Sequence, residues 1–285
     1  MPVKAGIFLS EILPSLNIFL VMAKLYFREV VSQLVLVFLL QIPLAVFAQP
    51  EKLDTDRPDQ TESAVLVPVG WMQFEMGFLR ERSGYSITTF EYPSLLSKYG
   101  LSKRIELRLI STISRSIDRS MPAQQQVISG LEPVEIGTKI ALWEEKGFLP
   151  KTSFICHLAF PFLAAKDLRI DKWAPNFRFT MQKSVSGNCA IGWNFGAEWN
   201  GEDEQPAWTY TLSPGFNLGK KWYGYVEAFG NIAANKSPEH NIDGGFAYWI
   251  TPDIKVDLSS GLGISTAAPG WYLAAGASIR FKAGK

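Results

Sequence analysis

The chain contains only two histidines, His157 and His240, which limits the acid–base chemistry that it can perform. Ser153 precedes His157 by four residues. A serine nucleophile needs a histidine within hydrogen-bonding reach. A strand rises about 3.3 Å per residue, so these two side chains would share a face but lie too far apart for a direct hydrogen bond. We therefore predict no catalytic residues.

Cysteine content and charge exclude further classes of site. Cys156 and Cys189 are the two cysteines, too few for a disulfide framework, and with two histidines they form no zinc pattern. We predict no metal and no cofactor. Lys and Arg total 28 against 27 Asp and Glu, so no basic excess is present to neutralise phosphates. A nucleic-acid partner is not expected.

Most of the charged residues lie in segments in which apolar and polar side chains alternate from one residue to the next. After Gly70, for example, Met72, Phe74, Met76 and Phe78 alternate with polar or small residues, which is the pattern of a half-buried strand. Clear segments of this kind occur around 72–78, 105–109, 134–142, 177–181, 191–199, 226–228, 254–258 and 273–281. Weaker segments occur at 87–99, 152–161, 207–218 and 242–251. The sequence thus predicts twelve strands.

Alternation alone does not separate a soluble sandwich from a transmembrane barrel, but strand length, connectors and aromatic residues do. Many segments run for about ten residues, as membrane barrels require. Connectors alternate between long ones, of which 114–131 is the longest, and short turns such as 219–220. Aromatic residues gather near strand ends: Trp71, Trp199, Trp208, Trp222, Tyr248 and Trp271. We predict an all-β fold, a transmembrane antiparallel up-and-down β-barrel of about 12 strands.

In such a barrel the polar face of each strand lines the lumen. The predicted lumen-lining charges are Glu75, Glu106, Arg108, Glu135, Lys139, Arg178, Glu198, Glu227, Lys255, Asp257 and Arg280. They could select a polar or amphipathic solute, or they could form cross-strand salt bridges that fill a narrow lumen. The nearly matched signs favour the salt-bridge network over an ion-selective pore.

A charged segment, Thr55–Glu62, precedes the first strand. Its candidate residues, together with the residue before it, are Asp54, Asp56, Arg57 and Asp59. One interpretation is a polar plug that enters the periplasmic mouth, with Arg57 paired to lumen carboxylates. The other is a solvated leader in which Pro58 prevents regular structure.

The N-terminus has the pattern of a secretory signal. Residues 30–48 are apolar and uncharged, Lys24 and Arg28 precede them, and small residues stand before Gln49. We expect cleavage after Ala48, and Met22 is a better start than Met1. The predicted divisions are a leader and signal peptide at 1–48, a polar periplasmic or plug segment at 49–69, and the barrel at 70–285.

Four stretches carry a family resemblance: residues 53–78 (LDTDRPDQTESAVLVPVGWMQFEMGF), 92–109 (YPSLLSKYGLSKRIELRL), 244–261 (GGFAYWITPDIKVDLSSG) and 274–281 (AAGASIRF). The chain resembles the bacterial outer-membrane "transporter" family of the meta-pathway of phenol degradation. This resemblance implies a monomeric barrel in a Gram-negative outer membrane that passes small, often aromatic or apolar molecules.

The sequence therefore predicts a porin-like passive channel for small apolar or aromatic solutes. Its expected partners are outer-membrane lipid, the solute and the barrel-assembly machinery, and it would act as a monomer. Two alternatives stay open: a non-conducting structural or adhesive barrel, and an outer-membrane phospholipase-like enzyme.

Overall fold

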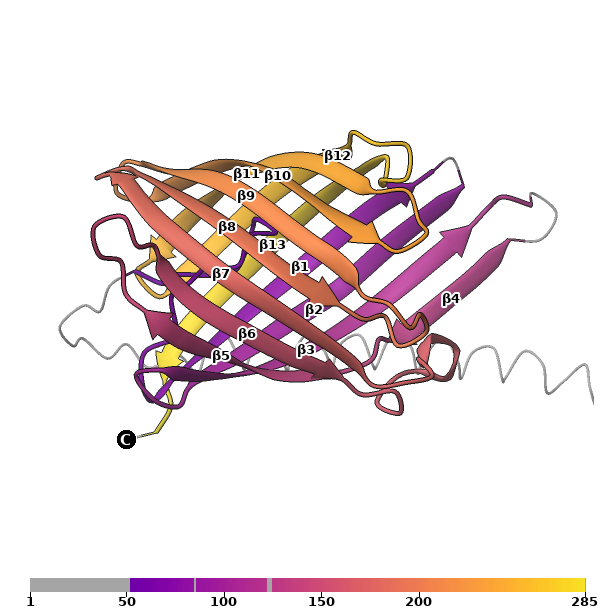
Figure 1. The fold of residues 1–285 in the computed structure, drawn as a ribbon, viewed down its shortest axis with the longest axis horizontal. Coiled ribbons are helices and arrows are strands. Elements are labelled where there is room, and N and C mark those ends of the chain that lie inside the picture. Colours follow the sequence, from indigo (N-terminus) through magenta and orange to yellow (C-terminus); the bar gives the residue numbers. More distant parts are fainter. Residues whose placement is uncertain (1–51, 85, 122–124, 285) are drawn as a thin grey trace, which may run out of the picture. The chain divides into compact units, whose positions relative to one another are not determined.

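The computed structural model describes residues 52–84, 86–121 and 125–284, which form an antiparallel β-barrel (Figure 1). The signal peptide and both candidate start residues lie outside the described residues. Because alternating side chains point to opposite sides of a strand, each strand can present one face to the lumen and the other outward. The strands are β1 (Trp71–Ser83), β2 (Ile87–Gly100), β3 (Ile105–Asp118), β4 (Gln126–Leu131), β5 (Glu135–Trp143), β6 (Lys151–Ala159), β7 (Ala174–Ser186), β8 (Cys189–Glu198), β9 (Ala207–Leu218), β10 (Trp222–Ala233), β11 (Glu239–Thr251), β12 (Ile254–Gly263) and β13 (Trp271–Lys282).

Consecutive strands pair with one another, with the exception of β4 and β5, and the β1–β13 pairing closes the cylinder. The closed ring runs through every strand except β4, because β3 pairs directly with β5. The predicted transmembrane barrel of twelve strands is confirmed. A single 3₁₀ turn, η1 (Lys166–Leu168), lies in the connector between β6 and β7.

The prediction of a loop over Ser114–Leu131 is wrong. The outer part of β3 continues to Asp118 and pairs with β4, in the register Ile113–Leu131 to Asp118–Gln126. Residues 132–134, with Pro133 in the middle, separate β4 from β5. Proline has no backbone N–H to donate, so it interrupts the hydrogen-bond ladder. β4 spans only six residues, so it lacks the long alternation that marks the other strands.

β2 contains a bulge. Between the pairs Glu91–Ser114 and Ser94–Thr112, two residues of β2, including Pro93, lie opposite one residue of β3. An extra residue in one strand reverses the relation between residue number and face. Odd-numbered Glu91 and even-numbered Ser94 consequently both face the lumen.

Burial is inverted relative to a soluble protein. The charged side chains of Glu106 and Lys139 are fully buried inside the cylinder, whereas Val226 and Phe246 are each 57 % exposed on its outer face. An outer apolar surface of this kind is solvated by lipid. Among the described residues, no helix is long and apolar enough to cross a membrane.

The connectors differ at the two ends of the barrel. One end has short turns, such as 187–188 and 252–253, and the other has long connectors, such as 160–173 and 199–206. In outer-membrane barrels the short turns are periplasmic and the long loops face outward. The alternation of connectors in the sequence predicted this polarity.

The lipid-facing assignment leads to a test within one strand. Val226 lies near the middle of β10, and Ile232 lies on the same face near its outer end. A Val226→Arg substitution is expected to lower the free energy of unfolding by about 2–4 kcal/mol, and Ile232→Arg by about 0–1 kcal/mol. Equilibrium unfolding by urea in lipid vesicles measures both. Equal costs for the two variants would contradict the assignment.

Candidate functional site

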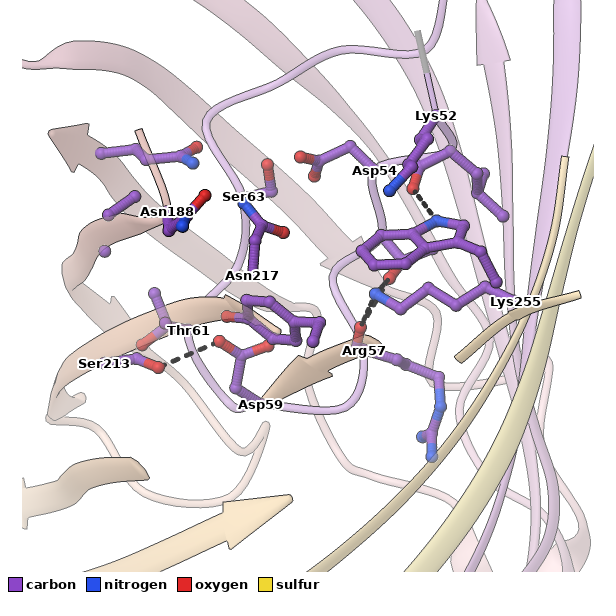
Figure 2. A pocket seen from close by; sticks show the side chains of 18 of the residues that line it. Lys52, Asp54, Arg57, Asp59, Thr61, Ser63, Asn188, Ser213, Asn217 and Lys255 are labelled. Atoms are coloured by element: carbon purple, nitrogen blue, oxygen red, sulfur yellow. Dashed lines mark hydrogen bonds between the residues drawn. The ribbon is translucent and has the colours of Figure 1, made fainter. Parts of the chain in front are cut away.

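The segment that precedes β1, residues 52–69, lies inside the barrel and is here called the luminal segment. At its start, the Leu53 amide donates to the carbonyl of Pro252, and the Trp249 indole donates to the carbonyl of Leu53 at 3.0 Å. Pro252 belongs to a short turn, so the segment enters from the periplasmic end. It then curves through the lumen, as the loop in Figure 2 shows, and returns to the same end at β1.

Asp56 is the main residue that attaches the luminal segment to the barrel wall. Its carboxylate lies 2.5 Å from Lys98 Nζ, 3.0 Å from Arg108 Nη1 and 3.0 Å from Lys139 Nζ, and all four side chains are buried. Burial alone raises the pKa of Asp56, but Lys139, Lys98 and Arg108 together outweigh it and hold the pKa well below its usual range. Asp56 therefore stays ionised inside the lumen.

Two wall carboxylates bind the backbone of the luminal segment. Glu75 Oε2 accepts from the amides of Asp56 and Arg57 at 3.0 and 3.2 Å, and Glu106 Oε2 accepts from the amide of Val67 at 2.7 Å. Hydrogen bonds to a charged acceptor are the strong kind. The ascending and descending arms are thus both fixed to the β1–β3 wall.

Glu62 links the two sides of the lumen. Its carboxylate lies 2.6 Å from Arg108 Nη2 and 3.6 Å from Arg178 Nη1, whereas its backbone faces β8. There the amide of Glu62 donates to Asn194 Oδ1 at 2.7 Å, and Asn194 Nδ2 donates to the carbonyl of Glu62 at 3.0 Å. Glu62 is therefore held by charge towards β3 and β7 and by neutral hydrogen bonds towards β8.

Arg57 occupies a space that two glycines provide. Gly77 and Gly276 are partners across β1 and β13, and a Cβ atom on either would lie only 2.2 Å or 2.4 Å from the guanidinium. Arg57 Nη2 lies 2.9 Å from Asp257 Oδ1. A side chain larger than glycine at either position would displace the guanidinium from this ion pair.

The tip of the luminal segment meets β9 and β10 through uncharged donors. The Gln60 amide donates to Glu227 Oε2 at 2.7 Å, and the hydroxyls of Thr61 and Thr211 lie 2.6 Å apart. The Tyr225 hydroxyl donates to the carbonyl of Pro58 at 3.3 Å. No Lys or Arg takes part in these contacts, in contrast to the Asp56 cluster.

A cavity of about 540 Å³ lies between the luminal segment and the wall formed by β8 and β9 (Figure 2). The wall here consists of small side chains, which leave room beside the segment: Ala190, Gly192, Ser213 and Gly215. Tyr223 and Trp249 also line the cavity, and Lys255 Nζ lies 5.5 Å and 5.3 Å from their ring centroids. The cavity is therefore lined by two aromatic rings, one cation and a wall of small side chains.

Asp59 points into this cavity and accepts a hydrogen bond from the Ser213 hydroxyl at 3.1 Å (Figure 2). Burial raises the pKa of Asp59 to about 7, against the opposing effect of Lys255. At the tip of the segment, one carboxyl thus changes charge close to neutral pH.

The predicted lumen-lining residues fall into two groups. Those on the periplasmic half and at the centre contact the luminal segment: Glu75, Glu106, Arg108, Lys139, Arg178, Glu227, Lys255 and Asp257. Glu135 and Glu198 lie towards the outer end, and Arg280 lies at the periplasmic rim, 2.9 Å from Asp253. Of the predicted plug residues, Asp56, Arg57 and Asp59 contact the wall through their side chains, and Asp54 does so through its carbonyl, which accepts from Gln73.

Three lumen-facing residues, Lys98, Asn194 and Thr211, were not predicted from the sequence. Lys98 follows the β2 bulge, which shifts the face on which later residues lie. Its position opposite Arg108 in the hairpin could have indicated a lumen-facing charge. Alternation with Ile191, Trp193 and Phe195 places Asn194 on the luminal face, but Asn194 and Thr211 carry no charge, so the sequence did not mark them as contacts of the luminal segment.

The histidines bind partners other than a serine. Arg108 Nε donates to His157 Nε2 at 3.0 Å, whereas the Ser153 hydroxyl donates to the carbonyl of Ala64. His240 belongs to β11, and its Nδ1 lies 2.7 Å from the Tyr210 hydroxyl. In the described part of the chain, no three metal-ligating side chains form a group.

Removing the Asp56 charge tests the attachment. Asp56→Asn leaves three buried cations without their shared carboxylate, so the free energy of unfolding should fall by about 3–5 kcal/mol. Single-channel recordings should show a higher conductance and a shift towards anions. Asp54→Asn is the matched control, because its side chain is not part of the cluster. Unchanged conductance and selectivity in Asp56→Asn would refute the role of the cluster.

The raised pKa of Asp59 predicts a pH dependence. In the docked segment the pKa of Asp59 is about 7, against its ordinary value of 3.8, so the docked segment favours the protonated form of this carboxyl. Docking of the tip is strongest below the ordinary pKa and weakens as the pH rises towards 7. Conductance should therefore increase between about pH 5 and about pH 8. Asp59→Asn, which keeps the shape without the charge, should give a flat profile; an unchanged pH profile in this variant would exclude Asp59 as the cause.

Comparisons with known proteins agree with this architecture. The COG4313 outer membrane channel from Pseudomonas putida F1 superposes with a TM-score of 0.63 at 11% identity, covering 83% of this chain and 100% of that chain. The NanC porin gives a TM-score of 0.48 at 9% identity, covering 73% of this chain and 98% of its own. A search of curated proteins finds no match. The first of these similarities supports the fold of an outer-membrane barrel.

Sequence comparison gives the family. A family model described as "Putative MetA-pathway of phenol degradation" matches residues 55–281, from the luminal segment to the last strand. The match covers most of the chain, and it includes the Asp56 cluster as well as the barrel. The chain is thus an outer-membrane β-barrel that belongs to this family of the putative MetA-pathway of phenol degradation.

Proposed function

We propose that the barrel is a passive channel for small apolar or aromatic solutes, which pass along the β8–β9 wall beside the luminal segment. The observation that carries this proposal is the cavity of about 540 Å³ between the segment and the small side chains of Gly192, Ser213 and Gly215. Its periplasmic opening lies at the turns that contain Gly187 and Gly219.

The luminal segment is the barrier that a solute has to pass. Charge-assisted contacts of Asp56 hold it to one wall, and hydrogen bonds to charged groups contribute about 1.5–3 kcal/mol each. The contact between Thr61 and Thr211 is neutral, and such bonds contribute about 0.5–1.5 kcal/mol. On the β9 side, Thr61 is therefore held less strongly than Asp56 and acts as the constriction, whereas the neighbouring Glu62 stays paired with Arg108.

The lining of the cavity indicates the class of solute. Tyr223 and Trp249 present aromatic faces, and Leu53 adds apolar surface. Most luminal charges are paired with one another, so they are not available to select an ion by sign. The family description refers to phenol degradation, which fits a small aromatic solute, and the Pseudomonas putida barrel of similar fold is an outer membrane channel, which fits passage of a solute.

A reversible crosslink tests whether the tip controls passage. The hydroxyls of Thr61 and Thr211 lie 2.6 Å apart, so cysteines at both positions should form a disulfide. In a background with Cys156 and Cys189 replaced by alanine, the oxidised Thr61→Cys/Thr211→Cys barrel should show little liposome uptake of phenol or benzoate. A reducing agent should restore uptake to the level of the cysteine-free parent.

The matched control is Thr61→Cys alone, which should be insensitive to oxidation. A panel with sugars of similar size tests solute class, and slower uptake of sugars than of aromatic compounds is expected. If the reduced barrel and the parent admit none of these compounds, the non-conducting structural alternative is correct. Equal uptake in oxidised and reduced states would show that the tip does not control passage.

A further inference from the structure

The outward face of the barrel is almost free of charge, and its exceptions are clustered. In the described strands, the outward-facing Lys, Arg, Asp and Glu residues are Arg80 and Arg82 on β1, Arg115 on β3, and Lys183 on β7. Lys183 lies near the periplasmic end, where its Nζ is 2.7 Å from Glu145. The three arginines lie together near the outer end and are here called the arginine patch.

Strand pairing brings the members of the patch together. Arg80 pairs with Phe90 on β2, and Phe90 pairs in turn with Arg115 on β3. Neighbouring strands lie about 4.8 Å apart, so the backbones of Arg80 and Arg115 are about 10 Å apart on one surface. Arg82 lies two residues beyond Arg80 on the same face of β1. Side chains of this length can converge on one anionic group or on two adjacent ones.

The depth of the patch corresponds to the outer membrane interface. The guanidinium carbon of Arg80 lies 5.4 Å from the ring centroid of Trp271 and 5.8 Å from that of Phe90. Tryptophan on a lipid-facing strand end marks the boundary between acyl chains and headgroups. An arginine costs little at that depth but much at the midplane of the membrane. Both rings lie against the Arg80 guanidinium, as in a cation–π contact.

Two members of the patch, Arg80 and Arg115, have no carboxylate partner in the described part of the protein. Among the described residues, neither Arg80 nor Arg115 forms an ion pair, whereas the luminal Arg108 lies within 3.1 Å of three carboxylates. A charge that the fold leaves unpaired beside the headgroup region has its counter-charge in the membrane. The surface between the patch and the middle of the barrel is apolar, with Phe78 and Leu273 exposed, and suits acyl chains.

We propose that the arginine patch binds the phosphate groups of a lipid A-type glycolipid of the outer leaflet, with its acyl chains on the apolar surface below. Guanidinium groups bind phosphate oxygens in pairs, which gives both strength and orientation. A headgroup with two phosphates on a broad sugar matches a patch that spans three strands. Binding is confined to the β1–β3 side, because the rest of the outward face of the described strands has no lysine or arginine in its outer half.

The test measures lipid bound to the folded barrel in detergent by native mass spectrometry. The probes are bisphosphorylated lipid A, its dephosphorylated form, phosphatidylglycerol and phosphatidylethanolamine. We expect the parent protein to retain bisphosphorylated lipid A and to bind the dephosphorylated form about tenfold or more weakly. The Arg80→Gln/Arg115→Gln variant should bind bisphosphorylated lipid A about tenfold or more weakly than the parent does. Lys183→Gln, an outward base at the other end, is the control and should bind as the parent does.

Arg115→Gln alone provides a second variant if the double variant folds poorly, and it should weaken binding to a smaller extent. The proposal is overturned if the double variant or the dephosphorylated lipid A binds as tightly as the parent combination. It is also overturned if phosphatidylglycerol binds as well as lipid A, since the patch would then recognise any anionic lipid. None of these outcomes depends on solute passage, so failure of the channel proposal would leave this one intact.

Discussion

The buried carboxylate of Asp56 is the constraint on which the rest of the lumen depends. Lys98, Arg108 and Lys139 come from three strands of the wall, and an unpaired charge in so enclosed a space is costly. The strands alone bring Glu75 and Glu106 to this cluster, and the luminal segment supplies the remaining negative charge. The segment is therefore part of the electrostatic balance of the barrel, and closing the cylinder without it would leave excess positive charge inside.

This balance is asymmetric around the lumen, and the asymmetry leaves room for a path. Charges concentrate on β1, β2, β3 and β5, where they fix both arms of the segment. The wall of β8 and β9 has small residues such as Gly192 and Ser213, which make few contacts and leave a cavity. A segment tied on one side and weakly held on the other can yield at its tip without losing its anchor.

Much of this fold follows from the sequence because alternation reports directly on which side of a strand a residue lies. Twelve strands and the inward position of Glu106 or Asp257 could be predicted in this way. Alternation does not predict the face of a residue where the period of two is interrupted. The bulge at Pro93 changes the face on which Lys98 lies, and the break at Pro133 separates the short β4 from the alternating β5. The partners of Asp56 could not be predicted, because pairings between a segment without regular structure and distant strands leave no periodic signal in one sequence.

The alternation of faces along a strand also explains why luminal charges and outward-facing charges are neutralised in different ways. A charge inside the barrel does not contact acyl chains. It is therefore tolerated at any depth, provided that it forms an ion pair with a counter-charge such as Asp56. A charge on the outward face has no such partner in the acyl-chain region, so it is tolerated only where headgroups begin. Arg108 and Arg115 differ by seven residues in one strand, and that odd number places them on opposite faces. Arg108 is consequently neutralised by the chain itself, and the counter-charge of Arg115 has to come from the membrane.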